Sequence, residues 1–393
     1  MKNLIKLRSL HVFDSICQFG SITKASQQIN LSQPAMTQSL TKLEKSLGVS
    51  LFQRGQGMIP TEAGAVFHAR VARGMEHLRE AVRRSAGREE RNNPHLYRLI
   101  SGSHLDCLHA TFEAGSFKQA AQALQLTLPT VHRYYRALEA LLGMSLAETR
   151  PNLVRRNASG EVFYGLSKLA EREFRQAISD LEGWKGNYEE TFTVGALPLV
   201  QSSILPKALI AFSQEFPHVT VVVVDGIYAS LLRQMKRGEV DYIIGALRRD
   251  QDADMIEQTP LFKDALIVIG RPGHPLSKLE KITRRDLAAY PWVMPRKGAP
   301  SRTYFDQFYE DLRRPSHLQC PIETGSFSAV CGLLRESDRL STISEQQAKF
   351  ELDNKLLAKI DYPLPQSDRT IGYANREGWR PSLPQRRFLQ LLK

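Results

Sequence analysis

The hydrophobic and polar positions of the first third of the chain alternate with the period of short helices. In the first such segment the apolar positions are Leu7, Leu10, Val12, Phe13 and Ile16. Gly20 is expected to end this helix, because a residue without a side chain tolerates a left-handed turn, and Ser21 to cap the next helix. Ser32 and Pro34 suit the first turn of a third helix. The buried stripe of that helix is predicted to be Leu40, Leu43 and Leu47. The pattern predicts a short helix, a tight turn and a longer helix.

The exposed face of the third predicted helix has the chemistry to contact a DNA major groove. Glutamine and threonine hydrogen-bond to base edges, alanine and methionine contact thymine methyl groups, and lysine reaches phosphate. The predicted contacts are Ser32, Gln33, Ala35, Met36, Thr37, Gln38, Ser39 and Lys42. Residues 50–54 and 58–59 flank a glycine-containing turn. They predict a two-stranded wing, with Arg54 at its base as a further contact to the DNA backbone.

A long helix is predicted after the wing, from its cap at Thr61 to about Ala86. Its apolar positions follow a spacing of four, three and four residues: Val71, Met75, Leu78 and Val82. A seam of this kind suits pairing with a partner helix. Packing of the seam on its own domain is the alternative that the spacing leaves open.

The whole pattern recurs at an offset of 95 residues. The positions that recur are Leu10, Gly20, Ser21, Ala25, Gln27, Leu31, Pro34, Leu43, Glu44, Leu47, Gly48, Ser50 and Leu51. Their counterparts are Leu105, Gly115, Ser116, Ala120, Gln122, Leu126, Pro129, Leu138, Glu139, Leu142, Gly143, Ser145 and Leu146. After one inserted residue, the positions 64, 66 and 67 recur as Gly160, Val162 and Phe163. A solenoid requires three or more units, so two units indicate a duplicated domain.

The N-terminal residues resemble the DNA-binding domain of LysR-type transcriptional regulators. The matching residues are Phe13, Gly20-Ser21, Ala25-Ser26, Leu31-Ser32-Gln33-Pro34-Ala35, Leu43-Glu44, Leu47-Gly48-Val49, Leu51-Phe52-Gln53-Arg54 and Pro60-Thr61-Glu62-Ala63-Gly64. The resemblance implies a winged helix-turn-helix, a dimerising linker helix and a C-terminal effector domain.

The second copy keeps the positions that determine the fold and changes the exposed ones. Its third helix presents Leu128, Thr130, His132, Arg133, Tyr134 and Arg136. Arginine and histidine can bind guanine or phosphate. The predicted DNA contacts of this copy are therefore Thr130, His132, Arg133 and Arg136. In its wing, Glu148 puts a carboxylate where a phosphate would lie, and nearby cations that can offset it are Arg150, Arg155 and Arg156. The second copy either contacts DNA or serves as a structural or dimerising module.

A second long helix is predicted from about Ala158 to Trp184. Its apolar seam, again at a spacing of four, three and four, is Ala170, Phe174, Ala177 and Leu181. This seam could equally form the dimer contact. Ordinary members of the family have one such helix, so the duplication puts the usual dimer geometry in doubt.

From Thr191 the pattern changes to alternating strands and helices. Strands are predicted at 192–196, 220–224 and 241–245, and helices at 204–216 and 229–237. This alternation predicts a parallel sheet with helices on both faces. The pattern resembles the LysR-type effector domain, itself similar to two-lobed periplasmic binding proteins. The matching residues are Val194-Gly195, Leu205-Pro206, Phe212, Phe216-Pro217, Val221, Gly238-Glu239-Val240-Asp241, Ile244-Gly245 and His274-Pro275-Leu276.

The predicted effector site follows from strand ends and helix starts, where ligands bind in such sheets. The candidate residues are Leu197, Pro198, Gln201, Ser202, Ser203, Arg248, Ser301, Arg302, Gly325, Ser326 and Ser328. Hydroxyl groups and helix N-terminal amides suit an anionic or polyhydroxylic ligand, although each segment also suits a simple capped helix start. Segments 195–198 and 245–248 look most similar to regulators of sugar uptake and aromatic-acid breakdown. The resemblance implies a sugar or an organic or aromatic acid.

Charge is concentrated in the duplicated half. The net charge of the chain is +12. Residues 1–186 hold 25 Lys+Arg against 16 Asp+Glu, or +9, and the remainder holds 28 against 25, or +3. A polyanionic partner such as double-stranded DNA would bind the basic half.

The cysteines and histidines do not indicate catalysis or metal binding. Cys17, Cys107, Cys320 and Cys331 form no CxxC pair, so reduced structural thiols are expected, with a redox disulfide between Cys320 and Cys331 as the alternative. We find no phosphate loop, nucleophile elbow or metal-spaced ligand set. The sequence predicts no enzyme, no cofactor and no metal. Without a long apolar run or a signal peptide, it also predicts a cytoplasmic protein with no membrane contact.

The chain is therefore expected to be α/β overall, with two all-α winged helix-turn-helix domains before a two-lobed effector domain. The predicted parts are a winged helix-turn-helix at 1–60, a linker helix at 61–86, a connection at 87–96, a second winged helix-turn-helix at 97–156, a second linker helix at 157–187, and an effector domain at 188–393. Its lobes are expected at about 190–269 with 371–393, and at about 270–370. The predicted function is a ligand-responsive transcriptional regulator acting as a homo-dimer or homo-tetramer. The alternative is a DNA-bridging architectural protein with a vestigial ligand domain.

Overall fold

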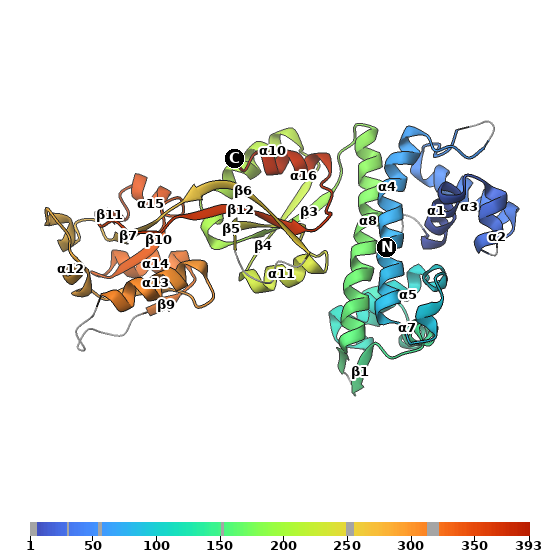
Figure 1. Cartoon of the computed structure of the whole chain (residues 1–393), viewed down its shortest axis with the longest axis horizontal. Coiled ribbons are helices and arrows are strands. Elements are labelled where there is room, and N and C mark those ends of the chain that lie inside the picture. The colour runs from blue at the N-terminus through green and yellow to red at the C-terminus, as the bar shows by residue number, and fades with distance from the viewer. Residues whose placement is uncertain (1–5, 30, 54–56, 151–152, 249–254, 313–321) are drawn as a thin grey trace. The chain divides into compact units, whose positions relative to one another are not determined.

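The computed structural model describes residues 6–29, 31–53, 57–150, 153–248, 255–312 and 322–393. The chain divides into unit 1, Met1–Glu190, and unit 2, Thr191–Lys393. Figure 1 shows the elements of each unit. The predicted contact Arg54 and the predicted disulfide partner Cys320 lie outside the described residues.

The first module of unit 1 has the predicted helix-turn-helix arrangement. Its helices are α1 (Leu7–Phe19), α2 (Ile22–Ile29), α3 (Gln33–Leu47) and the long α4 (Glu62–Ser85). Gly20 and Gly48 end α1 and α3 in the left-handed conformation, and the Ser32 hydroxyl accepts a hydrogen bond from the Ala35 amide at the start of α3. Within the described residues the predicted wing is a single bridge, between Phe52 and Pro60.

The second module repeats this arrangement and completes the wing. Its elements are α5 (Gly102–Ala114), α6 (Phe117–Leu124), α7 (Leu128–Leu142), β1 (Ala147–Arg150), β2 (Leu153–Arg156) and α8 (Ala158–Trp184). The strands β1 and β2 form an antiparallel hairpin that pairs Glu148 with Arg155. Thr127 caps α7 as Ser32 caps α3.

Two contacts are the same in both modules and explain why the sequence repeat keeps a glutamate and a glycine. The Glu44 carboxylate accepts a hydrogen bond from the Leu51 amide at 2.7 Å, and Glu139 accepts one from Leu146 at 2.8 Å. At the start of each long helix a glycine touches the chain before the wing. A Cβ would lie 2.0 Å from the Leu51 carbonyl oxygen at Gly64, and 1.9 Å from that of Leu146 at Gly160. In each module the carboxylate and the glycine together join the third helix, α3 or α7, to the long helix, α4 or α8.

The connection between the modules is only partly exposed. It contains the 3₁₀ turns η1 (Glu90–Asn92) and η2 (Leu96–Leu99). Residues 92–95 are exposed as expected, but Leu96 and Tyr97 are buried in the core of unit 1. The Tyr97 ring lies 5.5 Å from the ring of His11 and 5.0 Å from the Arg79 guanidinium. The core of unit 1 therefore begins again at Leu96, the last residue of the predicted connection at 87–96.

Helices α4 and α8 pack against each other along their length in an antiparallel pair (Figure 1). Both predicted seams are buried in one hydrophobic cluster that extends through both modules. A Cβ at Gly74 would lie 2.3 Å from the Phe174 ring, so the helices approach closely at this point. The seam of each long helix therefore finds its partner within the same chain, a pairing that the sequence patterns did not predict.

Unit 2 contains two lobes, each built on a sheet of five strands. The first lobe contains β3 (Thr191–Ala196), β4 (Thr220–Asp225), β5 (Tyr242–Ala246), β6 (Ile256–Asp264) and β12 (Arg369–Arg376), in the order β4-β3-β5-β12-β6. Its helices are α9 (Pro198–Gln201), α10 (Ile204–Glu215), α11 (Tyr228–Lys236) and α16 (Leu383–Gln390). Strands β4, β3 and β5 are parallel, but β12 is antiparallel to both its neighbours. The three strands predicted to be parallel are parallel to one another. The sheet as a whole is mixed, because β12 returns from the second lobe antiparallel to its neighbours.

The second lobe contains β7 (Leu266–Gly270), β8 (Trp292–Pro295), β9 (Ile322–Thr324), β10 (Leu340–Ser344) and β11 (Ala358–Ile360), in the order β11-β7-β10-β8-β9. Its helical elements are η3 (Pro275–Lys278), α12 (Arg284–Ala288), α13 (Pro300–Asp311), α14 (Phe327–Arg335) and α15 (Lys349–Asp353). The chain changes lobes at Ala265 and returns between β11 and β12, a few residues before the predicted points (Figure 1). Since only Ala265 separates two strands, hydrophobicity does not mark the change of sheet.

Gly74→Ala is expected to destabilise unit 1 even though alanine favours a helix. The added methyl meets the Phe174 ring, and overpacking of this kind costs about 1–3 kcal/mol. Gly165 in α8 is the matched control, because a Cβ there has no atom within 4 Å. Gly165→Ala is expected to stabilise by up to about 1 kcal/mol. Urea unfolding followed by circular dichroism measures both; a stabilised Gly74→Ala protein would contradict the close helix contact.

Acidification is expected to destabilise unit 1 through His11. Burial lowers the pKa of His11 to about 4, with opposing effects of Asp14, which raises it, and Arg98, which lowers it. The unfolded state takes up the proton first, so the contribution is complete above pH 6.5 and is lost as the pH falls towards 4. The loss is up to about 3 kcal/mol. Urea midpoints between pH 7 and pH 4.5 are expected to fall less in His11→Leu than in wild type, whereas exposed His95→Gln should behave as wild type.

Candidate nucleic-acid interface and effector site

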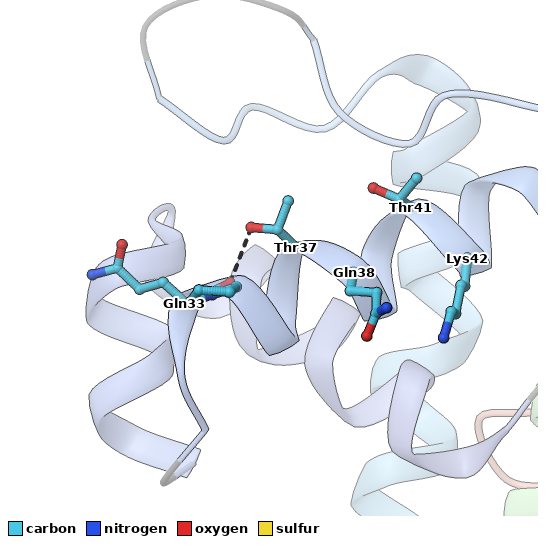
Figure 2. A pocket seen from close by; sticks show the side chains of 6 residues that line it. Gln33, Thr37, Gln38, Thr41 and Lys42 are labelled. Atoms are coloured by element: carbon cyan, nitrogen blue, oxygen red, sulfur yellow. Dashed lines mark hydrogen bonds between the residues drawn. The ribbon is translucent and has the colours of Figure 1, made fainter.

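The exposed face of α3 is lined by uncharged polar side chains and one lysine. The residues around an open hollow on this helix are Gln33, Pro34, Thr37, Gln38, Thr41 and Lys42. Figure 2 shows the Gln38 amide and the Lys42 ammonium group directed to one side of the helix, with Thr37 and Thr41 on the other. The Thr37 hydroxyl donates to the Gln33 backbone carbonyl at 3.0 Å. The Gln33 side chain is exposed at the start of the helix.

Four residues of the α3 surface differ from the sequence-based expectation. Met36 is fully buried and cannot reach a thymine methyl group, because it lies on the core side of the helix. The Ser39 hydroxyl donates to Ser9, and Ala35 is half-buried. Thr41 was missed, although it stands one helical turn after Thr37 and could have been found from that spacing.

The corresponding face of α7 carries arginines in place of amides. Arg133 and Arg136 are exposed. The Arg133 guanidinium lies 5.2 Å from the Tyr134 ring centre, and Arg136 donates to the Glu139 carboxylate at 2.7 Å. Both positions therefore present positive charge, whereas Gln38 and Thr41 occupy the equivalent positions in α3.

The other two predicted contacts on α7 are engaged within their own module. The His132 ring lies 4.0 Å from the Phe117 ring, centre to centre, and is half-buried. The Thr130 hydroxyl is bonded to that of Thr127 at 2.7 Å. These two side chains therefore already have partners within the module.

In the wing of the second module, arginine side chains accompany the carboxylate of Glu148. Glu148 and Arg155 are both exposed and stand opposite each other in the hairpin. Arg150 is exposed at the end of β1. Arg156 instead packs over the Tyr164 ring at 4.4 Å and pairs with Glu161 at 3.3 Å. Two of the three predicted offsetting cations are thus exposed on the wing.

In the first lobe of unit 2, the predicted effector residues surround the short helix α9. Leu197 is buried and Pro198 is exposed at its start. The Gln201 amide donates to the Ala196 carbonyl at 2.8 Å, and the Ser202 hydroxyl donates to the Gln347 carbonyl of the second lobe at 2.9 Å. Ser203 precedes α10 without capping it through its side chain.

Arg248 also connects the two lobes. Its guanidinium lies 4.1 Å from the centre of the Tyr228 ring, and its Nη2 donates to the Gly298 carbonyl at 3.1 Å. Gly298 lies just before α13 of the second lobe. The predicted residues Ser202 and Arg248 are thus brought to the contact between the lobes.

In the second lobe, Arg302 is engaged by three neighbours of its own lobe. Its side chain donates to Asp306 at 2.5 Å, to Glu323 at 2.8 Å and to the Pro295 carbonyl at 2.9 Å. The residue is 9% exposed. These bonds join α13 to β8 and β9, so its role in this structure is within the lobe. Helical spacing could have suggested the pair of Arg302 with Asp306, four residues along, but not the pair with Glu323 on another element.

The remaining predicted residues of the second lobe lie at helix starts. The Ser326 hydroxyl accepts a hydrogen bond from the Ala329 amide at 3.3 Å and is bonded to the Ser328 hydroxyl at 3.0 Å. Gly325, Ser326 and Ser328 are exposed, and Ser301 is half-buried in the first turn of α13. The reading of this segment as a capped helix start is confirmed for α14.

The described cysteines are Cys17, Cys107 and Cys331, and all three are free. Burial, with a nearby carboxylate in each case, raises the pKa of the thiol to about 12 in Cys17 and to about 11 in Cys107 and Cys331. Such thiols are poorly reactive near neutral pH.

Two helix-turn-helix modules on one core and a two-lobed α/β unit define a protein that combines DNA binding with ligand binding. The sequence profile described as "Bacterial regulatory helix-turn-helix protein, lysR family" matches residues 7–65 and again 103–161. The profile described as "LysR substrate binding domain" matches residues 185–393. Since these segments cover more than half of the chain, the protein belongs to the LysR family of ligand-responsive transcriptional regulators.

Relatives differ in how much of the duplicated half they match. The transcriptional regulator GalR of Pseudomonas putida is 29% identical over 383 residues, which cover 96% of this chain and 93% of GalR. The regulator PcaQ of Agrobacterium fabrum is also 29% identical, but over 75% of this chain and 94% of its own length. The part of this chain outside the PcaQ match is about as long as one repeat, so GalR matches both modules and PcaQ matches a single-module length.

Solved structures share the fold at low sequence identity. A full-length OxyR variant from Pseudomonas aeruginosa is 21% identical, with a TM-score of 0.54, and the match covers 74% of this chain and 92% of OxyR. CbnR, solved in a complex with its target DNA, is 19% identical, with a TM-score of 0.51, and covers 74% of this chain and 97% of its own. Among the described helices, none is long and apolar enough to cross a bilayer.

Proposed function

We propose that unit 1 reads double-stranded DNA through α3, and through α7 as a second contact, while unit 2 binds a small effector between its lobes. The observation that carries this proposal is the α3 surface, where amide, hydroxyl and ammonium groups stand together on one exposed helix face. These groups match base edges and phosphates in a major groove. The contacts proposed for α3 are Ser32, Gln33, Ala35, Thr37, Gln38, Thr41 and Lys42, with Arg54 from the wing.

For α7 the proposed contacts are Arg133 and Arg136, supported by their exposure and charge. Thr130 and His132 shape the same face from within the module, because each is held by a neighbour. The net charge of +9 over residues 1–186, from 25 Lys+Arg and 16 Asp+Glu, supports a polyanionic partner for this unit.

The proposed effector site lies where the two lobes meet, around Ser202 and Arg248. These residues bond to backbone carbonyls of the opposite lobe, at Gln347 and Gly298. An effector with carboxylate or hydroxyl groups could exchange these bonds for its own and shift the lobes. Further lining is proposed from Leu197, Pro198, Gln201, Ser203, Ser301, Gly325, Ser326 and Ser328. The class of effector that fits is a sugar or an organic or aromatic acid.

Effector binding is proposed to change DNA binding in a homo-dimer or homo-tetramer in the cytoplasm, as expected for the family. The two events are coupled in the thermodynamic sense if each ligand changes the affinity for the other. The alternative, an architectural protein with a vestigial ligand domain, is not favoured, because the whole of unit 2 matches the substrate-binding profile.

Replacement of Gln33 and Thr37 by alanine is expected to reduce specific DNA binding. Each bidentate base contact contributes about 1–3 kcal/mol of discrimination, so the loss is about 10-fold or more. A DNase footprint on the upstream region of the gene, compared with Gln214→Ala as a control in unit 2, measures it. An unchanged footprint in the double variant would exclude α3 as the reader.

Ser202→Ala and Arg248→Met are expected to weaken effector binding and leave the DNA affinity in the absence of effector within a few-fold of wild type. Isothermal titration with a panel of sugars and of aromatic and aliphatic acids, in the presence and absence of operator DNA, measures both quantities. Heat from no member of the panel would rule out the proposed effector classes. An effector bound equally well by both variants would place the site elsewhere.

A further inference from the structure

We infer that one chain is sufficient to recognise both half-sites of an operator. Helices α4 and α8 hold the two modules together as an intramolecular pair, and α3 and α7 contact half-sites that differ in sequence. This inference rests on the proposed DNA binding. It adds the composition of the operator and the number of chains needed to read it. Four observations on unit 1 support it.

The first observation is that the contact between the modules is reciprocal, as in a two-fold pair. After α4 ends, the Gly87 amide donates to the Leu142 carbonyl at the end of α7, at 2.8 Å. After α8 ends, the Lys185 ammonium group donates to the Leu47 carbonyl at the end of α3, at 2.6 Å. Leu47 and Leu142 are equivalent positions of the repeat. Each long helix thus ends on the recognition helix of the other module, the arrangement that an isologous dimer has between two chains.

The second observation is an ion cluster around the buried Arg70 that favours pairing of α4 with α8 over pairing of two identical helices. Arg70 of α4 donates to Asp180 of α8 at 2.7 Å and to Glu173 at 3.3 Å, and Arg73 pairs with Glu173 at 3.2 Å. The Arg70 side chain is 7% exposed. Removal of one partner from such a cluster leaves a buried charge unpaired and is strongly unfavourable.

This cluster exists only when α4 meets α8. In the repeat, Glu173 and Asp180 correspond to His77 and Arg84. In an α4–α4 pair of the same geometry, Arg70 would therefore face a histidine and an arginine. In an α8–α8 pair the two carboxylates would face positions equivalent to Arg70 and Arg73, which are Leu166 and Leu169. An α4–α4 pair and an α8–α8 pair would each bury charges without oppositely charged partners. The charges therefore specify the α4–α8 pair.

The third observation is that the seams cover each other. All eight apolar seam positions of the two helices are buried in the core that runs through both modules. The Gly74 and Phe174 contact leaves no room for a side chain at the crossing. The linker-helix surfaces are thus occupied within one chain.

The fourth observation is the difference between the two recognition surfaces. The position of Gln38 in α3 is taken by Arg133 in α7, and that of Gln33 by Leu128, which is 41% exposed. Glutamine pairs with adenine, arginine with guanine, and an apolar side chain contacts the thymine methyl. One half of the operator is therefore specified by adenine at the Gln38 contact, and the other by guanine at the Arg133 contact. A palindrome satisfies only one of the two modules at a time.

The test uses the full chain and short duplexes cut from the region that the footprint protects. One duplex keeps both half-sites, two others are palindromes made from either half, and a fourth is of random sequence. Wild type is expected to bind the natural duplex about 5- to 100-fold more tightly than either palindrome. A palindrome bound as tightly as the natural duplex would overturn the inference. Equal binding of all duplexes, random DNA included, would instead be a failure of the proposed function itself.

Two surface variants assign the halves. Gln38→Ala is expected to lose discrimination only at the adenine of one half-site, and Arg133→Ala only at the guanine of the other. Gln214→Ala and Arg285→Ala are the matched controls, since they remove the same groups from exposed helix positions in unit 2. If either variant lost discrimination equally in both halves, each half would be read by the same helix from two chains, and the inference would be wrong.

A mixing experiment distinguishes pairing within one chain from exchange of α8 between chains. Gln38→Ala and Arg133→Ala chains are co-expressed with different tags, and assemblies that carry both tags are purified. If α4 and α8 pair within the chain, no chain has two intact modules, and affinity for the natural duplex stays at the level of the single variants. If α8 is exchanged, half of the pairs are intact and tight binding returns. Restored binding would overturn the inference.

Discussion

The antiparallel contact between α4 and α8 determines the structure of unit 1. Each helix carries an apolar seam that must be removed from water, and each seam is covered by the other. Close approach at Gly74 gives the pair its contact distance, and the charges of Arg70, Glu173 and Asp180 fix its register. Because both modules are joined to these helices by the Glu44 and Glu139 hydrogen bonds and by buried glycines, their separation and orientation follow from this one contact.

Duplication followed by divergence explains how one fold presents two chemically different surfaces. The positions kept in both copies are those that the backbone requires: glycines in the left-handed conformation, caps, and Glu44 with its counterpart Glu139. Exposed positions on α3 and α7 changed as well, and a substitution there costs little folding energy. The surface chemistry could therefore diverge while the fold was kept.

Unit 2 combines stiff lobes with a small number of polar contacts between them. Within the second lobe, Arg302 ties a helix to two strands through three hydrogen bonds. Between the lobes, Ser202 and Arg248 donate to backbone carbonyls, and Ser344 donates to Asp264 at 2.8 Å. Bonds of this kind can be exchanged for bonds to a ligand at little net cost, whereas apolar cores resist repacking. The polar contacts are thus the places where an effector can act.

The sequence revealed the parts of the candidate site that depend on local pattern. Helical spacing, caps and the repeat located α3 and α7, and the polar side chains on their exposed faces indicated the residues that we propose to contact DNA. The sequence did not predict contacts with neighbours that are distant along the chain. Met36 is buried by the core, Arg302 is bound by Glu323, and His132 stacks on Phe117. It also did not predict that Leu96 and Tyr97 join the core of unit 1, because their partners in that core lie in other helices.

By itself the sequence determined the family, the duplication, the order of the helices in unit 1 and of the first strands and helices in unit 2, and the existence of two apolar seams. These features are encoded by residues a few positions apart, through helical periodicity, caps and turns. Only the tertiary structure decided that the seams are partners of each other, that β12 makes the first sheet mixed, and which predicted site residues remain exposed. Those outcomes depend on contacts between residues about 100 positions apart, such as Arg70 with Glu173, and no local pattern specifies which of two equivalent seams a helix will meet.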